Sequence, residues 1–445
     1  MNWDEAGREA VERLRRMLRF DTTNPPGNEM ALAQMLAEEV RTCGGEASVY
    51  EASAGRGNLV VRLKGDGSAR PLLLLSHLDV VPAEPDKWTY PPFDGMLAEN
   101  HVWGRGAIDS KLTGAVMMQV LLMAIRSGLK LKRDIVLVAA ADEELGAAYG
   151  VDWLVQNHPE VFDAEFGINE AGGFTAVIDG KPLYLCQVAE KGSAPVDFVA
   201  RGKPGHSSVP HDDNAIVALG RALTRLGESK MPHHPPECVR SFFESAAAVQ
   251  NDGRVSELLG AVLIPSQSDE ALAALPVERR DRLMFDAMLR NTCAPTLVNA
   301  GTKRNVIPSE ARAGLSGRPL PGVTEASFLA EVRELVGTGV DVDLVEPFRE
   351  GVQFDHETEL FGVLAEATRQ FDPDATMVPY MQTGGTDSRF LDDLDIHVYG
   401  YIPMRHEPGP NFFELCHGHD ERVSVANVEF AVQVLFEAMR RMAGK

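Results

Sequence analysis

Side chains of the kinds that bind metal ions stand at the ends of apolar segments in this sequence. His77 and Asp79 directly follow one apolar run, Glu143 and Glu144 directly follow another, and Asp109 lies between them in a glycine-rich loop. Imidazole and carboxylate groups are common ligands of catalytic zinc. A site with two ions also needs a bridging carboxylate, an open position for water and a base. The stretch 76–144 therefore predicts half of a two-metal site.

The residues themselves leave a plainer role open for each of these side chains. His77 could be a structural histidine, although Asp79 is well placed to accept a hydrogen bond from its second ring nitrogen. Asp109 precedes a predicted helix and could simply cap its N-terminus. Glu143 and Glu144 could form a solvated loop, but adjacent carboxylates repel each other unless a cation or a shared proton compensates. That repulsion favours one of them as a metal ligand and the other as a general base.

Later residues could complete the site. Glu170 follows a short apolar segment, and His417 and His419 lie in a polar loop near the end of the chain. None of the three is specific by itself, and the residues alone do not decide which histidine would bind a metal ion.

The elements that would position these side chains follow the pattern of an α/β sheet. Segments 71–76 and 134–141 are continuously apolar, which is typical of strands buried on both faces, and an apolar helix is predicted between them at 110–127. The order strand, helix, strand predicts a parallel sheet, and ligands of such sheets bind outside the carboxyl ends of the strands. The early candidate ligands, up to Glu170, would then meet at one rim of the sheet.

The chain is long enough for more than one domain, and its character changes twice. We expect a first part of the catalytic domain at 1–190, an inserted α+β module with an antiparallel sheet at 191–349, and a second part of the catalytic domain at 350–445. The insertion is expected to contain strands near 194–201, 296–300 and 311–318, because apolar and polar residues alternate there. No chemistry is assigned to residues 232–295.

Composition narrows the class of protein. The formal net charge of -22 disfavours nucleic acid and anionic membrane surfaces as partners. Five scattered cysteines without Cys-x-x-Cys spacing fit a reducing cytosol better than a disulfide framework. No apolar run approaches about 20 residues, and the N-terminal segment lacks the apolar centre of a signal peptide. A cytoplasmic location is therefore expected.

An ordered set of motifs resembles the M20 metallopeptidase family, which includes acetylornithine deacetylase, succinyl-diaminopimelate desuccinylase, aminoacylase-1, carboxypeptidase S and glutamate carboxypeptidases. The motifs cover nearly the whole chain: Ser76-His77-Leu78-Asp79-Val80-Val81-Pro82, 88–95, Gly104-Arg105-Gly106-Ala107-x-Asp109-x-Lys111, Asp142-Glu143-Glu144-x-Gly146, Gly205-His206-Ser207-Ser208, Asn305-Val306-Ile307-Pro308 and His417-Gly418-x-Asp420-Glu421. The resemblance implies a zinc-peptidase-type mixed sheet sandwiched by helices, with an inserted lid domain that mediates dimerisation.

The resemblance also implies two zinc ions in each subunit, with Co²⁺ or Mn²⁺ as possible substitutes. Asp109 would bridge the ions, Glu143 would act as general base and Asp79 would orient His77. The remaining ligands would be His77 and Glu170 for one ion, and Glu144 and His417 for the other. His417 is preferred over His419 because the family pattern is His-Gly-x-Asn/Asp-Glu.

Substrate contacts are implied by the same resemblance. His206 would reach the active site of a partner subunit in a homodimer and stabilise the oxyanion. Asn305 and Arg318 match positions that contact the substrate carboxylate, although they could also be a turn residue and a surface arginine. The loop that contains Gly384, Gly385 and Thr386 matches the substrate pocket.

These matches predict a di-zinc hydrolase that cleaves the amide bond of N-acyl amino acids or short peptides with a free carboxylate. The long segment 232–295 and the stretch 299–308 resemble the carboxypeptidase S and N-acyl-amino-acid hydrolase branch more than a dedicated desuccinylase. A dipeptidase or glutamate-carboxypeptidase-type exopeptidase is the alternative. A non-catalytic binding protein on the same fold is the remote alternative. Such a protein would not need Glu143, and the sequence retains this residue.

Overall fold

The computed structural model describes residues 2–410 and 412–445, which form two compact units. Unit 1 comprises 1–188, 354–380 and 386–445, and unit 2 comprises 189–353 and 381–385. The predicted catalytic domain comprises 1–190 and 350–445, and the predicted insertion comprises 191–349. This division places the short segment 381–385 in the catalytic domain. The role of unit 2 as a lid and dimerisation domain stays a prediction.

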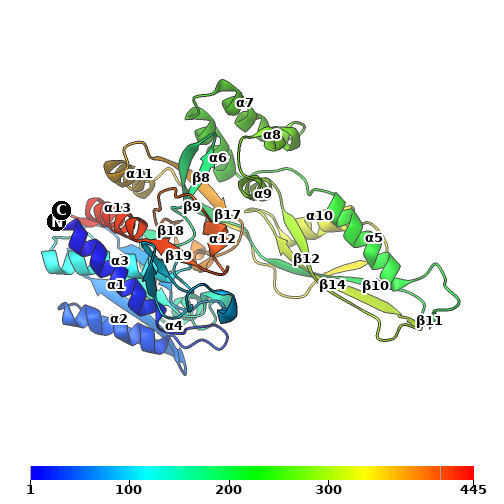
Figure 1. Ribbon diagram of the computed structural model, residues 1–445, viewed down its shortest axis with the longest axis horizontal. Coiled ribbons are helices and arrows are strands. Elements are labelled where there is room, and N and C mark those ends of the chain that lie inside the picture. Colours follow the sequence, from blue (N-terminus) through cyan, green and yellow to red (C-terminus); the bar gives the residue numbers. More distant parts are fainter. Residues whose placement is uncertain (1, 411) are drawn as a thin grey trace. The chain divides into compact units, whose positions relative to one another are not determined.

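The centre of unit 1 is a mixed sheet (Figure 1). Its strands are, in spatial order, β1 (Ala47–Ser53), β2 (Arg56–Leu63), β6 (Ile135–Ala140), β3 (Leu72–His77), β7 (Phe166–Asn169), β18 (His397–Gly400) and β9 (Lys181–Glu190). β3 runs parallel to β6 and β7, and β18 runs parallel to β7, whereas β1, β2 and β9 pair antiparallel with their neighbours. The parallel core that the sequence predicts is thus flanked by antiparallel strands.

Helices cover the sheet because its central strands are apolar on both faces. Every residue of β3 and β6 is buried. α3 (Lys111–Ser127) connects these two strands, is buried along most of its length, and packs with α1 (Trp3–Leu18) and α13 (Val425–Ala443). α2 (Met30–Thr42) packs on β1 and β2, and α11 (Glu359–Phe371) packs on α13. The mixed sheet sandwiched by helices is therefore confirmed.

One hairpin in unit 1 was not predicted, although its signal is present in the sequence. β8 (Thr175–Ile178) pairs antiparallel with β9 through a tight turn at Asp179 and Gly180, both of which have positive φ. Asp-Gly is a favoured pair for such turns. β17 (Thr376–Gln382), which pairs with β9, was also missed.

Unit 2 contains a separate four-stranded antiparallel sheet, in agreement with the predicted α+β insertion. The strand order is β12 (Thr292–Ala300), β14 (Glu310–Arg318), β10 (Ala194–Arg201) and β15 (Asp341–Leu344). α5 (Ala215–Glu228) and α10 (Glu325–Val336) pack on it, and their apolar residues share one core with those of the sheet. The short strands β11 (Gly205–His206) and β13 (Val306–Ile307) form a two-stranded ribbon.

The segment without assigned chemistry is helical from residue 237 onward. It forms α6 (Glu237–Ala248), α7 (Gly253–Val262), α8 (Ser268–Ala274) and α9 (Arg279–Met288). The smaller elements of the chain are β4 (Met96–Ala98), β5 (His101–Trp103), β16 (Val352–Gln353), β19 (Arg422–Ser424), α4 (Val151–Asn157) and α12 (Phe412–Leu415). Within the described residues, no helix combines the length and apolar character that crossing a membrane requires.

Candidate active site

The candidate ligands lie at the carboxyl ends of neighbouring strands, as expected. His77 is the last residue of β3, Glu170 directly follows β7, and Glu143 and Glu144 lie in a short 3₁₀ helix shortly after β6. Asp109 lies in the loop before α3, where Ser110 and not Asp109 occupies the N-cap position. Capping of the helix therefore does not explain why an aspartate stands at position 109.

His77 presents its two ring nitrogens to different carboxylates. Its Nε2 lies 3.1 Å from Asp109 Oδ1 and 3.3 Å from Glu170 Oε2. Its Nδ1 lies 3.3 Å from Asp79 Oδ1 and 3.0 Å from the backbone oxygen of Asp79. Asp79 thus fixes the orientation of the ring, and Nε2 faces the space that a metal ion would occupy.

His417 approaches the same centre from the other side. Its Nε2 lies 3.1 Å from Asp109 Oδ2 and 3.3 Å from Glu144 Oε2. His419, the alternative from the same loop, is exposed and pairs instead with Glu84 at 3.0 Å. The two carboxylate oxygens of Asp109 therefore face two different imidazoles, which is the arrangement that a bridging carboxylate needs.

Buried carboxylates crowd this centre. Burial, together with the charges of Asp387, Glu170 and Glu144, raises the pKa of Glu143 well above its usual value. Burial and the charge of Asp109 raise the pKa of Glu144 to about 7, and burial and Glu170 raise that of Asp387 to about 8. The negative charges of these clustered carboxylates repel one another, and a bound cation would relieve that repulsion.

The pKa values of the two histidines are also raised, which favours the charged form of the imidazole. Burial disfavours the charged form of His77, but Glu170, Asp109 and Asp79 outweigh it and raise its pKa well above the usual value. Hydrogen bonding to Asp109 and Glu144 raises the pKa of His417 to about 10.

Two overlapping groups of possible metal ligands, which share His77, lie at this centre. Ligand atoms of His77, Asp109 and Glu144 lie within 4.8 Å of one another, and so do those of His77, Glu143 and Glu170. Glu144 Oε1 is buried without a hydrogen-bond partner among the described residues. An unpartnered buried carboxylate oxygen is costly, and a metal ion would satisfy it.

Glu421 has no predicted role, although it lies in the motif His417-Gly418-x-Asp420-Glu421. The buried Glu421 carboxylate accepts hydrogen bonds from Arg105 Nη1 (2.7 Å) and from the backbone N–H groups of Gly106 (2.9 Å), Ile108 (2.7 Å) and Asp109 (3.0 Å). Glu421 therefore holds the loop that carries Asp109. Its buried position could be found only from the tertiary structure.

The predicted substrate contacts belong largely to unit 2. His206 is exposed in β11, and its Nδ1 lies 2.7 Å from Ser208 Oγ. Asn305 is exposed beside this ribbon and accepts a hydrogen bond from the Ser207 N–H (3.2 Å), while Arg318 ends β14. Gly384 and Gly385 are also in unit 2, whereas Thr386 is buried in unit 1. Their contacts with a substrate stay predictions.

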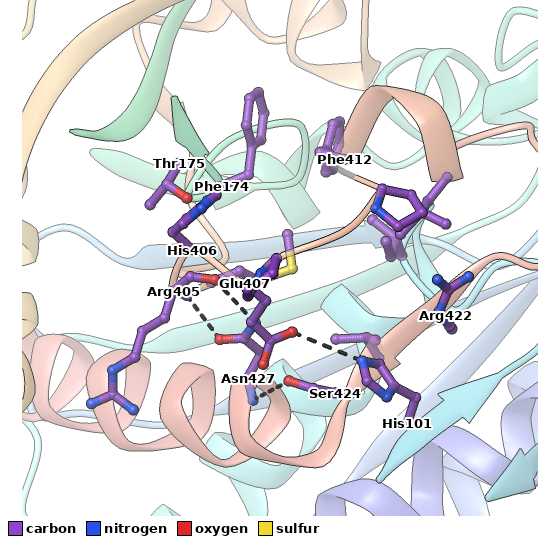
Figure 2. A pocket seen from close by; sticks show the side chains of 16 residues that line it. His101, Phe174, Thr175, Arg405, His406, Glu407, Phe412, Arg422, Ser424 and Asn427 are labelled. Carbon is purple, nitrogen blue, oxygen red and sulfur yellow. Dashed lines mark hydrogen bonds and ion pairs between the residues drawn. The ribbon is translucent and has the colours of Figure 1, made fainter. Parts of the chain in front are cut away.

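Unit 1 also contains a pocket of about 100 Å³ (Figure 2). Its apolar lining is formed by Ile108, Phe174, Met404, Phe412, Leu415 and Val423. The ring of Phe412 stacks on that of Phe174 with 4.3 Å between the centroids. On the polar side, His101 Nε2 lies 4.0 Å from Glu407 Oε2, the pair joined by a dashed line in Figure 2.

The pocket is formed by segments that also carry candidate ligands. Ile108 adjoins Asp109, and Leu415 lies two residues before His417. Among the described residues that line the pocket, none is itself a candidate ligand. The pocket is thus a separate space, lined by polar as well as apolar side chains, whose walls are continuous with the candidate metal centre.

Comparison with known proteins agrees with this geometry. The model of Peptidase family M20/M25/M40 matches residues 73–441. Probable carboxypeptidase S-like 2 from Dictyostelium discoideum is 29% identical over 402 residues, which cover 86% of this chain and 74% of that protein. The N-fatty-acyl-amino acid synthase/hydrolase PM20D1 from Homo sapiens is 29% identical over 391 residues, 84% of this chain and 74% of that protein.

The fold is similar to that of a solved M20 structure. The metallo-carboxypeptidase Sso-CP2 from Sulfolobus solfataricus has a TM-score of 0.70 at 18% identity, covering 97% of this chain and 98% of that one. Family match, sheet architecture and clustered ligands agree with the resemblance inferred from the motifs. We conclude that this chain is a metallohydrolase belonging to Peptidase family M20/M25/M40.

Proposed function

We propose that this enzyme is a di-zinc hydrolase that cleaves the amide bond of N-acyl amino acids or short peptides bearing a free carboxylate. The observation that carries the proposal is the position of Asp109, whose two carboxylate oxygens face His77 and His417 on opposite sides. In this arrangement one ion would be held by His77 and Glu170 and the other by Glu144 and His417. Co²⁺ or Mn²⁺ could replace zinc at such a site.

Zinc bound here supplies Lewis-acid polarisation of the scissile carbonyl and lowers the pKa of water toward about 7. The protein supplies the proton transfer. Glu143 accepts the proton of the attacking water and delivers it to the leaving amine. Asp79 keeps His77 in the orientation that binding requires.

The remaining predicted contacts complete the proposal. His206 of one subunit stabilises the oxyanion in the active site of the other subunit of a homodimer. Asn305 and Arg318 bind the substrate carboxylate, and the backbone from Gly384 to Thr386 lines the substrate site. A cytoplasmic location is proposed from the sequence alone.

One side of the pocket beside the centre is apolar, around Ile108, Phe174 and Phe412, and this side supports a substrate with an apolar group. A cavity of about 150 Å³ lined by aliphatic and aromatic groups can hold benzene, so the pocket of about 100 Å³ suits a group of about four carbons. We assign it to the acyl chain. The names of the PM20D1 relatives, N-fatty-acyl-amino acid synthase/hydrolase, also refer to N-acylated amino acids, although a fatty-acyl chain is longer than this pocket.

A carboxypeptidase or dipeptidase activity is the second candidate, favoured by the similarity to carboxypeptidase S-like 2. It differs from the first only in the acyl side of the bond. Side-by-side hydrolysis of N-acyl amino acids and dipeptides, with metal analysis of the purified protein, distinguishes the two. Absence of hydrolysis across both panels in zinc-loaded protein would contradict the proposal and favour a non-catalytic binding protein.

The role of Glu143 has its own test. Glu143→Ala should lose at least about 10²-fold in kcat, the lower end of the contribution of a general base, while both ions stay bound. Wild-type turnover in this variant would show that the mechanism is wrong. Loss of one ion would show that Glu143 is a ligand instead.

A further inference from the structure

Behind the candidate metal centre lies a buried polar cluster that the proposed mechanism does not use. Its acidic members are Glu29, Asp79 and Asp142, which are 0%, 0% and 2% exposed. Arg56 and Asn24 lie among them, 6% and 2% exposed. Three buried carboxylates with one arginine leave an excess of negative charge, so each carboxylate depends on the donors around it.

Arg56 serves only two of the three carboxylates. Its Nε and Nη2 donate to Glu29 at 2.8 Å each, and Nη2 also donates to Asp142 Oδ1 at 2.8 Å. No hydrogen bond from Arg56 to Asp79 is present among the described contacts. Asp79 and Asp142 therefore need another group between them.

Asn24 is that group. Its side-chain Nδ2 donates to Asp79 Oδ2 at 2.8 Å and to Asp142 Oδ1 at 2.9 Å. Both amide hydrogens are thus directed at carboxylates. The amide oxygen is buried without a hydrogen-bond partner in the described structure. The opposite orientation of the amide would point its oxygen at two carboxylates, so the surrounding charges select this one.

The two carboxylates that Asn24 joins control the turn of Glu143 and Glu144. Asp79 Oδ1 accepts the Glu143 N–H at 3.1 Å, and Oδ2 accepts the Glu144 N–H at 3.2 Å. Asp142 starts the turn with a φ of 68°, a conformation that non-glycine residues rarely adopt. Its Oδ2 accepts the Tyr149 N–H at 3.1 Å, which closes the turn from the other side.

We propose that Asn24 is a positioning residue of the metal centre. Its amide links Asp79 and Asp142 and so sets the placement of the turn that presents Glu143 and Glu144. No side-chain hydrogen bond from Asn24 to a candidate metal ligand is present among the described contacts, so it acts through these two aspartates. The inference rests on the proposed function for the roles of Glu143 and Glu144, but the hydrogen-bond arrangement itself does not.

A series of substitutions at residue 24 separates this role from simple packing. Asn24→Asp keeps the shape of the side chain but puts a third carboxylate between two others. If Asn24 only fills space, Asn24→Asp should behave like wild type and Asn24→Ala should be worse. The proposal predicts the reverse order, with Asn24→Asp worse than Asn24→Ala. Asn24→Ser, which can donate to only one aspartate, should lie between Asn24→Ala and wild type.

Zinc binding to the apoprotein, measured by competition with a chromogenic chelator, is the first readout. Residues behind metal ligands typically contribute 10-fold to 100-fold in metal affinity, and we expect a loss of that size for the more weakly held ion in Asn24→Ala. The absorption spectrum of the Co²⁺ form should change with it, because the position of Glu144 changes. At saturating zinc, kcat should remain reduced with KM nearly unchanged, since Glu143 is also displaced.

Thr22→Val is the matched control. Thr22 is buried in the same segment and donates to the backbone oxygen of Leu78 at 2.7 Å, but it contacts no carboxylate. It should keep wild-type zinc affinity and Co²⁺ spectrum. If Asn24→Ala and Asn24→Asp both bind zinc as wild type does, with an unchanged Co²⁺ spectrum, the proposal is refuted.

The two proposals fail in different ways. If the wild-type protein binds two ions but hydrolyses no amide, the proposed function fails, and zinc affinity and the Co²⁺ spectrum still test Asn24. If Asn24→Ala or Asn24→Asp is not recovered as folded protein, Asn24→Ser decides by the same readouts. A wild-type affinity and spectrum in Asn24→Ser would then contradict the proposal, and a loss would support it.

Discussion

The support of the Asp109 loop by Glu421 leads to a quantitative prediction for Glu421→Gln. In the wild type, Oε2 accepts from Arg105 Nη1 and the Gly106 N–H, while Oε1 accepts from the N–H groups of Ile108 and Asp109. Glutamine retains one oxygen and replaces the other with an NH₂ group, which cannot accept. The remaining oxygen will face Arg105, because the bond to a charged donor is the stronger one.

The cost follows from the two donors that lose their acceptor. The N–H groups of Ile108 and Asp109 are left facing an NH₂ group in a buried site, and each unsatisfied buried donor costs about 1–3 kcal/mol. We therefore expect a loss of about 2–6 kcal/mol in the free energy of unfolding. That is a large part of the about 5–15 kcal/mol that stabilises a typical protein. Zinc affinity should fall as well, because the Asp109 N–H is one of the two donors.

Urea unfolding of the apoprotein, followed by tryptophan fluorescence, measures this loss. All four tryptophans, Trp3, Trp88, Trp103 and Trp153, lie in unit 1, so the signal reports on the unit that contains Glu421. Asp420→Asn is the neighbouring control. Asp420 accepts hydrogen bonds from exposed Thr89 at 2.6 and 2.8 Å, and surface changes usually cost within about 0.5 kcal/mol. If Glu421→Gln costs no more than Asp420→Asn, the assigned role of Glu421 is wrong.

Three other predictions concern the pocket, the partner subunit and a buried lysine. Phe412→Ala enlarges the apolar side of the pocket and should shift kcat/KM toward longer N-acyl chains, by about fourfold for each methylene newly buried. An unchanged chain-length profile would show that the acyl chain does not bind in this pocket. His206→Ala should lose turnover with its zinc content unchanged, and mixing it with His77→Ala should restore up to about one quarter of wild-type activity through mixed dimers. If activity does not recover after the dimers have exchanged subunits, the result would count against action of His206 in the partner's active site. Burial, together with the charge of Arg318, lowers the pKa of Lys191 to about 7. Between this pKa and the ordinary pKa of lysine, the unfolded chain binds more protons than the folded chain. The contribution of Lys191 to the free energy of unfolding therefore rises from pH 7 to pH 10. Urea unfolding at a series of pH values should show no such rise for Lys191→Met. Equal slopes of the free energy of unfolding against pH for the variant and the wild type would refute this prediction.

Much of the catalytic unit follows from short-range sequence signals. The apolar runs before His77 and Asp142 predict strands buried on both faces, and they form β3 and β6 of the sheet. The order strand, helix, strand places their carboxyl ends at one rim, so His77, Glu144 and Glu170 could be expected near one another. β9 was missed because its sequence begins with Lys181 and Pro182, and only the Asp-Gly pair before it indicates a hairpin.

Other features depend on contacts between residues far apart in the chain. His417 and His419 are equally good ligands by type, and only the folded loop brings His417 to Asp109 and Glu144 while His419 pairs with Glu84. Hydrogen bonds over such separations depend on distance and direction, which no local pattern encodes.

The kind of centre could be predicted from the sequence, because the identity and order of the candidate ligands and the strands that end at them are local properties. The contacts that hold that centre in place are visible only in the folded chain. Asn24 reaches Asp142 across 118 residues, and Glu421 reaches the Ile108 and Asp109 N–H groups across more than 300. Both act from buried positions where an unpaired carboxylate would be costly, and burial of this kind exists only once the whole chain has folded.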